Sequence, residues 1–300
     1  ELDAAIDTYN QAIKIKPDHE KAYINMGIAL QDKGELEAAI ETYNQAIKIK
    51  PNYSETYYNM GNALKDKGEL DAAIDTYNQA IKIKPDYAEA YNNMGIVLKD
   101  KGELDAAIDS YNQAIKIKPD YAETYNNIGN ALKDKGELDA AIDSYKQAIK
   151  IKPDYAEAYY NMGNSLNDEG DLEAAIDSYN QAIKIKPDYE IAHVHKLYLQ
   201  AHICEWAATE EESEVIPKLG ILMQFAEPFA ILVLEDAPER HRLRSEIYAT
   251  SKFSQKPLPI ASRPTQKPER LRIGYFSSDF KEHPVAYLMA KVIETHNRDC

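Results

Sequence analysis

The stretch AEAYNNMGIVLKDKGELDAAIDSYNQAIKIKPDY, residues 88–121, decides the fold because near-identical copies of it fill most of the chain. One proline recurs every 34 residues, at Pro17, Pro51, Pro85, Pro119, Pro153 and Pro187. A period of this length is typical of helical-repeat proteins. Full copies begin at Glu20, Ser54, Ala88, Ala122 and Ala156, and residues 1–19 hold the second half of an earlier copy. We therefore expect a mostly α-helical stack of repeats over residues 1–189.

The first half of each copy predicts an amphipathic helix. In residues 88–121, Tyr91, Met94 and Leu98 recur with helical spacing and form one apolar stripe. Gly95 lies in the same stripe, and its missing side chain lets a neighbouring helix approach closely. Gly102 is expected to end this helix, because glycine adopts the left-handed conformation without strain.

The second half of each copy predicts another helix, and its ends are marked by proline and by acidic residues. The helix is expected to end at Lys118, because Pro119 cannot continue it. Asp120 and Glu123 have the spacing of a capping box, which predicts the start of the next first helix. The apolar residues of the second helix are Leu104, Ala107, Ile108, Tyr111, Ala114 and Ile115.

These residues resemble the tetratricopeptide consensus position by position, with Tyr91 where that consensus often has Trp and Leu98 where it often has Tyr. The resemblance implies a right-handed superhelix of helix pairs. It also implies that the stripe containing Glu89, Asn93 and Asp100 faces a concave groove.

Two polar columns recur on that stripe. The asparagine column consists of Asn25, Asn59, Asn93, Asn127 and Asn161, and the aspartate column consists of Asp32, Asp66, Asp100, Asp134 and Asp168. Side-chain amides offer both donors and acceptors, as an extended peptide backbone requires, and the carboxylates favour basic or hydroxyl-bearing partner residues. We therefore interpret the columns as a site for extended polypeptides. The alternative is that recent duplication alone repeated these residues, leaving a passive solvated surface.

Charge divides the chain in two. The whole chain carries −15, of which −13 falls on residues 1–189, which contain no Arg, and −2 on residues 190–300. An acidic chain lacks the basic surface that phosphate binding needs, so we expect no nucleic-acid partner.

Other composition features argue against a metal site and a membrane span. Cys204 and Cys300 cannot form a disulfide framework, which fits a reducing, cytoplasmic compartment. His193 and His195 are two residues apart on an expected helix, so they point to different sides. No apolar run reaches the length of a transmembrane helix.

The repeat frame degrades from Glu190, and residues 190–251 predict a degenerate repeat followed by capping or transition helices. Pro228 and Pro238 are expected helix starts. We interpret Trp206 as a cap over the last repeat rather than as a ligand contact. Residues 252–270 contain four prolines and predict an extended connector.

The last thirty residues begin something different. Leu271–Phe276 predicts a short buried strand, residues 277–282 a loop, and Pro284 the start of a helix running to about His296. Strand, loop and helix form the opening unit of a doubly wound α/β domain, in which ligands sit beyond the carboxyl ends of the strands. His283 lies at that place.

The segment LRIGYFSSDFKEHPVAYLM, residues 271–289, closely resembles the start of the catalytic region of the protein O-linked N-acetylglucosamine transferases, glycosyltransferase family 41. The resemblance implies a GT-B-type catalytic domain that moves N-acetylglucosamine from UDP-GlcNAc to Ser or Thr hydroxyls of a polypeptide delivered by the repeats. The family's active-site histidine matches His283, as general base or as organiser; the alternative is a helix-capping role.

The second lobe of that family is absent from this sequence, so we expect a fragment that is inactive alone. Its donor-binding residues would lie beyond Cys300, and no cofactor or metal is expected on the fragment itself. Two alternatives remain: a tetratricopeptide interaction scaffold without catalysis, and an O-fucosyltransferase of the same architecture.

Overall fold

The computed structural model describes residues 1–204, 213–221, 231, 234 and 237–252. The chain divides into two units, Glu1–Ser251 and Lys252–Cys300. Several features predicted from the sequence lie outside the described residues: Trp206, the Pro228 helix start, the connector beyond Lys252, the strand at Leu271–Phe276, and His283. The β-α unit of the catalytic domain therefore stays a prediction.

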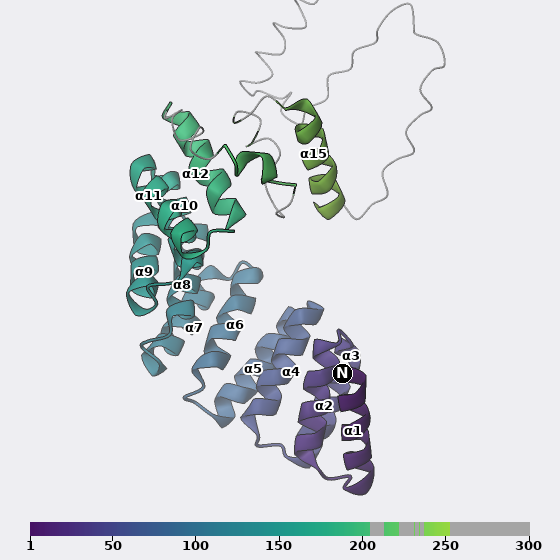
Figure 1. The fold of residues 1–300 in the computed structure, drawn as a ribbon. Coiled ribbons are helices and arrows are strands. Elements are labelled where there is room, and N and C mark those ends of the chain that lie inside the picture. The colour runs from purple at the N-terminus through teal and green to yellow at the C-terminus, as the bar shows by residue number, and fades with distance from the viewer. Residues whose placement is uncertain (205–212, 222–230, 232–233, 235–236, 253–300) are drawn as a thin grey trace, which may run out of the picture. The chain divides into compact units, whose positions relative to one another are not determined.

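The repeats are helix pairs that stack into a superhelix (Figure 1). The first helices of the five copies are α2 (Glu20–Asp32), α4 (Ser54–Lys67), α6 (Ala88–Asp100), α8 (Ala122–Asp134) and α10 (Ala156–Glu169). The second helices are α3 (Leu36–Ile49), α5 (Leu70–Ile83), α7 (Leu104–Ile117), α9 (Leu138–Ile151) and α11 (Leu172–Ile185). Helix α1 (Leu2–Ile15) is the second helix of the half copy at residues 1–19, and α12 (Glu190–His202) opens a sixth copy. The mostly helical prediction is confirmed.

The two kinds of helix form two layers. Each first helix contacts the first helix of the next copy, from α2 to α4 and onward to α10, whereas successive second helices make at most marginal contacts. A stack whose first helices lie closer together curves toward them. The first helices therefore form the inner layer and the second helices the outer layer.

A glycine and a tyrosine lock the two helices of each pair. A Cβ atom placed on Gly95 of α6 would lie 2.5 Å from the ring of Tyr111 on α7, closer than real contacts allow. Tyr111 is fully buried there. The same glycine and tyrosine meet in all five copies. The close approach predicted at Gly95 is confirmed, and its partner is the second helix of the same copy.

The turns inside the pairs use left-handed residues. Gly102 has a φ of 79°, which confirms the predicted helix stop. The sixth copy has Cys204 where the others have glycine, and Cys204 keeps the left-handed conformation with a φ of 59°. A non-glycine residue is strained in this region of backbone space.

The predicted capping box at Asp120 and Glu123 is wrong. The residue preceding α8 is Tyr121, and no side chain caps this helix. Asp120 lies one residue outside the capping position, where only its backbone carbonyl reaches the helix, accepting from Ala122 N at 3.2 Å. Helix α7 ends at Ile117, and Lys118 has left the helical conformation, with φ −128° and ψ 86°, as the residue before proline prefers.

A side-chain cap occurs instead in the last full copy. Among helices α1–α12, only α11 has one: Asp171 Oδ1 accepts from Ala174 N at 3.1 Å. The four earlier full copies have glutamate at this position, and its side chain makes no such bond; these residues are Glu35, Glu69, Glu103 and Glu137. Aspartate has the side-chain length that N-caps prefer.

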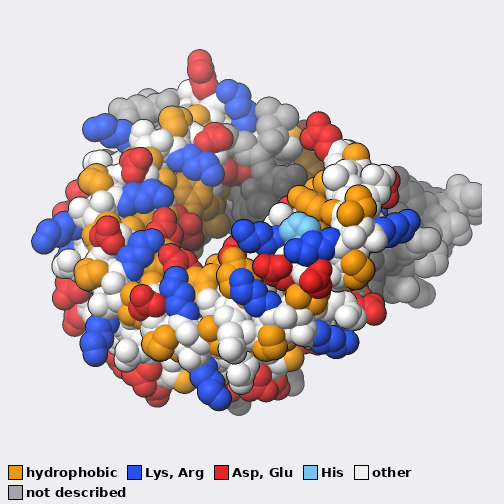
Figure 2. Space-filling view, turned by 90° about the horizontal axis from the view of Figure 1, so that it is seen from below, with side chains coloured by type: hydrophobic (Ala, Val, Ile, Leu, Met, Phe, Trp, Pro, Cys, Tyr) orange, Lys and Arg blue, Asp and Glu red, His pale blue; other side chains and the backbone are white. Residues whose placement is uncertain are grey.

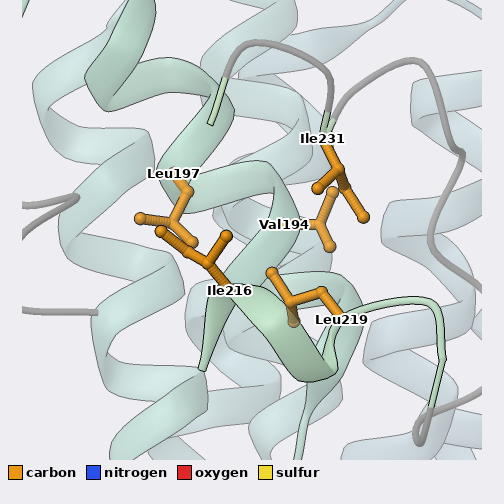
Figure 3. Packing of buried hydrophobic residues seen from close by; sticks show 5 residues of the cluster. All are labelled: Val194, Leu197, Ile216, Leu219 and Ile231. Carbon is orange, nitrogen blue, oxygen red and sulfur yellow. The ribbon is translucent and has the colours of Figure 1, made fainter. Parts of the chain in front are cut away.

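A small apolar cluster covers α12 at the end of the stack. Val194 and Leu197 of α12 converge with Ile216 of η1, with Leu219, which follows η1, and with Ile231 (Figure 3). The 3₁₀ helix η1 spans Ile216–Lys218. All five side chains are almost completely buried.

Polar contacts tie the same region together. The fully buried Arg244 donates from Nε to Leu219 O at 2.7 Å and from Nη2 to Ile216 O at 2.8 Å. Arg244 belongs to α15 (Pro238–Lys252), which begins at Pro238 as predicted. The backbone N–H of Gly220 donates to the buried Glu190 carboxylate at the start of α12.

Candidate binding groove on the inner helices

The asparagine column lies on the inner helices, and three of its members bond to the preceding copy. Asn93 Nδ2 donates to Tyr58 OH at 3.1 Å and to Asn62 Oδ1 at 2.9 Å. The corresponding bonds further along join Asn127 Nδ2 to Asn92 Oδ1 at 3.1 Å and Asn161 Nδ2 to Asn126 Oδ1 at 3.0 Å. The column therefore links successive copies to one another.

These bonds leave part of the amide available at Asn127 and Asn161, whereas Asn93 uses both of its donors and also accepts from Asn92 Nδ2 at 3.1 Å. The Oδ1 atoms of Asn127 and Asn161 accept no hydrogen bond within the described part of the chain. Asn25 is exposed, and neither Asn25 nor Asn59 makes a side-chain hydrogen bond among the described residues. A peptide N–H on this surface would therefore find acceptors, and at Asn25 and Asn59 unused donors as well.

Sequence reasoning missed the residue that precedes each column member. This neighbour is Ile24, Tyr58, Asn92, Asn126 and Tyr160 in the five copies. Asn126 is only 1% exposed and Asn92 also accepts from Thr124 Oγ1 at 2.9 Å, so both amides belong to the internal network. The doubled asparagines at 92–93 and 126–127 could have indicated this network in the sequence. Two adjacent helix residues cannot both face the same surface, so one amide is buried and needs a hydrogen-bond partner.

The aspartate column is more exposed than the asparagine column, and lysines partly offset its charge. Lys99 Nζ lies 3.6 Å from Asp134, and Lys133 Nζ lies 3.1 Å from Asp168, each pair spanning two copies. Asp66 accepts from Gln31 Nε2 at 2.7 Å in the same arrangement. Asp100 lies 4.0 Å from its own neighbour Lys99, and Asp32 has no ion pair among the described residues.

Tyrosines of the second helices point their hydroxyls toward the inner layer. Tyr77, Tyr145 and Tyr179 each donate to an asparagine of their own copy, at 2.7 to 2.8 Å. The acceptors are Asn62, Asn130 and Asn164. Tyr111 has Ile96 at that place instead, and its buried hydroxyl has no hydrogen-bond partner.

Rings gather in two of the copies. The ring of Tyr58 lies 5.0 Å from that of Tyr87, and the ring of Tyr160 lies 5.3 Å from that of Tyr189. His195 replaces asparagine in the sixth copy; its ring lies 5.4 Å from Tyr160, and its Nδ1 lies 3.1 Å from Asn164 Oδ1. Burial raises the pKa of Tyr189 to about 12, with a smaller contribution from Glu157.

His193 lies apart from His195, with Nε2 3.0 Å from Pro187 O. The two histidines therefore lie in different environments. Within the described residues, no group of three or more potential ligands is placed to hold a metal ion. None of the described helices is long and apolar enough to cross a membrane.

The surface has a hollow on the face turned to the viewer in Figure 2, bordered by hydrophobic, acidic and basic side chains. Charges of both signs are interleaved there rather than separated into blocks. Such a surface offers hydrogen bonds and ion pairs to a partner at many points.

Two family models match different parts of the chain. The family model described as the cilia and flagella-associated protein 70 C-terminal domain, a tetratricopeptide model, matches residues 1–184. The model described as glycosyl transferase family 41 matches residues 246–300. None of the curated proteins matches the chain.

Solved structures resemble the repeats. A crystal structure of MamA protein is 29% identical, with a TM-score of 0.51, and the match covers 56% of this chain and 92% of that one. YrrB, described as a TPR protein with an unusual peptide-binding site, is 25% identical, with a TM-score of 0.50 and coverage of 61% and 95%. MamA from Desulfovibrio magneticus RS-1, at 20% identity, TM-score 0.52 and coverage of 57% and 96%, shows the fold alone.

Proposed function

Since the chain belongs, through residues 1–184, to the tetratricopeptide family described as the cilia and flagella-associated protein 70 C-terminal domain, we propose that its inner helices bind an extended polypeptide. One observation carries the proposal. The members of the asparagine column recur once per copy along the inner helices, a line that keeps unused acceptors at Asn127 and Asn161. A backbone laid along this line meets a similar partner at each copy, so recognition is tolerant of sequence. The similarity to YrrB, which is described as having a peptide-binding site, supports the same use of the fold.

The test uses the two column members that make no internal bond. We expect the pair Asn25→Ala and Asn59→Ala to weaken binding of a labelled Ser/Thr-rich peptide by about thirtyfold, since each of the two lost hydrogen bonds is worth roughly 1 kcal/mol. Fluorescence anisotropy measures the affinity, and thermal melting by circular dichroism should show no loss of stability.

A matched control exists on the outer helices. Five exposed asparagines recur there, at Asn10, Asn44, Asn78, Asn112 and Asn180. Replacing Asn44 and Asn78 by Ala changes as many amides in the same region of the array and should leave the affinity unchanged. Equal affinities for the inner and outer variants would contradict peptide binding by the column.

We further propose that this chain is the front part of a protein O-glycosyltransferase that moves N-acetylglucosamine from UDP-GlcNAc to Ser or Thr. The match of residues 246–300 to glycosyl transferase family 41 supports this, and that range contains His283. In this proposal the repeats supply the acceptor polypeptide and His283 serves the active site.

The experiment is intact-mass measurement of a Ser/Thr peptide incubated with the product of the complete gene, with UDP-GlcNAc or GDP-fucose as donor. A mass increase of one N-acetylhexosamine residue, lost in His283→Ala, is the expected result. A fucose increase would reassign the donor. No increase with either donor would leave the interaction scaffold as the function.

A further inference from the structure

Two copies differ from the others on the inner layer, and they differ in the same way. The copies beginning at Ser54 and Ala156 have Tyr58 and Tyr160 where the copies between them have Asn92 and Asn126. Both tyrosines are partly exposed. Each packs beside a loop tyrosine and a second-helix tyrosine of its own copy, so three rings meet: Tyr58 with Tyr77 and Tyr87, and Tyr160 with Tyr179 and Tyr189.

The carboxylates beside these rings also differ. In the two middle copies the glutamate of the first turn is ion-paired: Glu89 lies 3.7 Å from Lys118, and Glu123 lies 3.5 Å from Lys152. Glu55 and Glu157 are the equivalent residues of the two ring-bearing copies. Among the described residues, neither has a lysine within ion-pair distance. Tyr53 OH donates to Glu55 at 2.6 Å, but this neutral donor leaves the charge of the carboxylate uncompensated.

The equivalent lysines of these two copies, Lys84 and Lys186, lie over the ring of the loop tyrosine, as Lys118 and Lys152 also do at 4.3 and 4.7 Å. Lys84 Nζ is 4.5 Å from the centre of the Tyr87 ring, and Lys186 Nζ is 5.0 Å from that of Tyr189. These rings therefore already attract one cation each, as electron-rich faces do.

Each of these two carboxylates stands three residues before its tyrosine on the same helix, Glu55 before Tyr58 on α4 and Glu157 before Tyr160 on α10, so the two side chains share one helix face. Burial raises the pKa of Tyr87, with added contributions from the Tyr58 ring and Glu55. Burial likewise raises the pKa of Tyr189, and Glu157 adds to it. Ring and carboxylate thus share one location in each copy. We call the two locations the tyrosine corners: Glu55, Tyr58 and Tyr87, and Glu157, Tyr160 and Tyr189.

We propose that each tyrosine corner binds a Lys or Arg side chain of the polypeptide held on the inner helices. A cation satisfies both parts of a corner, because the carboxylate attracts its charge and the ring faces attract it again. Arginine fits best, since its planar group stacks on a ring while its N–H groups reach a carboxylate. The net charge of −13 on residues 1–189 favours a basic partner over an acidic one.

The inference rests on the peptide-binding function proposed above and adds a specificity to it. The two middle copies, with their amides and neutralised glutamates, would hold backbone between the corners. The partner would therefore carry two separated basic residues joined by a sequence-tolerant segment. A neutral aromatic side chain would leave the carboxylate of each corner without a cation.

The experiment compares three labelled Ser/Thr-rich peptides that differ only at two positions, which hold Arg, Gln or Phe, at several spacings. Binding to the full chain is measured by fluorescence anisotropy at two salt concentrations. We expect the Arg peptide to bind about tenfold or more tightly than the Gln peptide at one preferred spacing, and the difference to shrink with salt. A Phe peptide that binds as tightly as the Arg peptide would overturn the proposal.

The variants Tyr58→Asn and Tyr160→Asn give the middle copies' own residue to the corners, so folding should be kept. Asparagine also preserves an acceptor for Asn93, which now donates to Tyr58 OH. Each change is expected to weaken the Arg peptide by about threefold to tenfold and to leave the Gln peptide unchanged. Equal losses for both peptides would contradict a cation site.

A charge-matched pair of variants excludes a general electrostatic effect. Glu55→Gln with Glu157→Gln removes the two carboxylates that lack a lysine, whereas Glu89→Gln with Glu123→Gln removes the two that have one. Only the first pair should abolish the preference for Arg; equal effects would overturn the corners. If all peptides bind equally, the tyrosine corners are refuted but binding by the asparagine column is not. If no peptide binds, the proposed peptide-binding function itself is refuted.

Discussion

At the scale of single residues, one buried hydroxyl, that of Tyr111, separates the third copy from its neighbours. Ile96 stands where the second, fourth and fifth copies have an asparagine, so the hydroxyl of Tyr111 is buried without an acceptor. A buried hydroxyl that loses water and gains no hydrogen bond costs about 1 to 3 kcal/mol. Burial is also the main reason why the pKa of Tyr111 is raised. The third copy therefore holds an unfavourable group that its neighbours have satisfied.

We expect Tyr111→Phe and Tyr145→Phe to act in opposite directions. Tyr111→Phe removes a hydroxyl without a partner and should raise the unfolding free energy by up to about 1 kcal/mol. Tyr145→Phe breaks the bond to Asn130 and leaves a polar acceptor unsatisfied, which should cost roughly 1 kcal/mol or more. Urea unfolding followed by circular dichroism measures both. The pair control each other, because the removed atoms are identical, and equal losses would contradict the geometry.

At the scale of elements, the turn between paired helices needs one left-handed residue. Five copies supply glycine, and no atom lies near enough to Gly102 or Gly170 to hinder a side chain there. The requirement is thus conformational only. Cys204 meets it in the sixth copy at a cost, since a left-handed non-glycine residue loses about 1 to 2 kcal/mol.

Cys204→Gly is therefore expected to stabilise the end of the stack by about 1 kcal/mol, and Gly102→Ala to destabilise the third pair by a similar amount. Hydrogen exchange localises each effect, because neighbouring copies in a repeat array are only partly coupled. Cys204→Ala serves as the control, since it removes the thiol and keeps the side-chain carbon. A gain with alanine as large as that with glycine would assign the effect to the thiol rather than to the backbone.

The helices and their order were predictable because several local signals agree within every copy. Gly95, Gly102 and the Lys118–Pro119 step each constrain the backbone through short-range sterics, which a sequence displays directly. The capping box was predicted wrongly because Asp120 and Glu123 have the right spacing, but Tyr121 occupies the capping position. A shift of one residue decides a cap, and spacing alone does not fix it.

The inner surface was predictable in outline only. The column residues follow from helical periodicity, yet their bonds to the preceding copy depend on how far each pair is rotated against the next. Nothing in a single copy specifies that rotation. For the same reason the pairing of Glu89 and Glu123 with lysine, and the absence of such pairs at Glu55 and Glu157 among the described residues, emerged only from the structure.

At the scale of the whole molecule, one lysine in each of the first four full copies links its helix pair to the pair before it. Lys101 lies 2.7 Å from Asp71 in the preceding copy and 2.6 Å from Glu103 in its own turn. Lys33, Lys67 and Lys135 form the same bridges. The fifth copy has Glu169 at this place, facing Asp139 and Asp171. The last junction between full copies thus has repulsion where the others have attraction.

Glu169→Lys should restore this link and raise the melting temperature, with a smaller gain in high salt. Desolvation, followed by the carboxylate of Asp139, raises the pKa of Glu169 in the folded protein. Its contribution to stability is therefore present below the pKa of the unfolded chain, near 4.5, and is lost as the pH rises through the higher folded value. The gain from lysine should accordingly be larger at pH 7 than at pH 4, as thermal melts at the two pH values would show.

Lys135→Glu is the reciprocal control, since it places the fifth copy's arrangement at the fourth copy. It should lower the melting temperature at pH 7. An unchanged melting temperature in both variants would mean that these exposed bridges contribute nothing measurable.

Near-identity of the copies has a consequence for any guest chain. If all copies were identical, a bound polypeptide shifted by one repeat would make the same contacts. Many binding registers would then be equally populated, and the polypeptide would diffuse easily along the inner helices. Tyr58 and Tyr160 break this translational symmetry, because only two of the five copies have them. A polypeptide whose basic residues reach both tyrosines would be held in one register, and a polypeptide that reaches neither would exchange between registers.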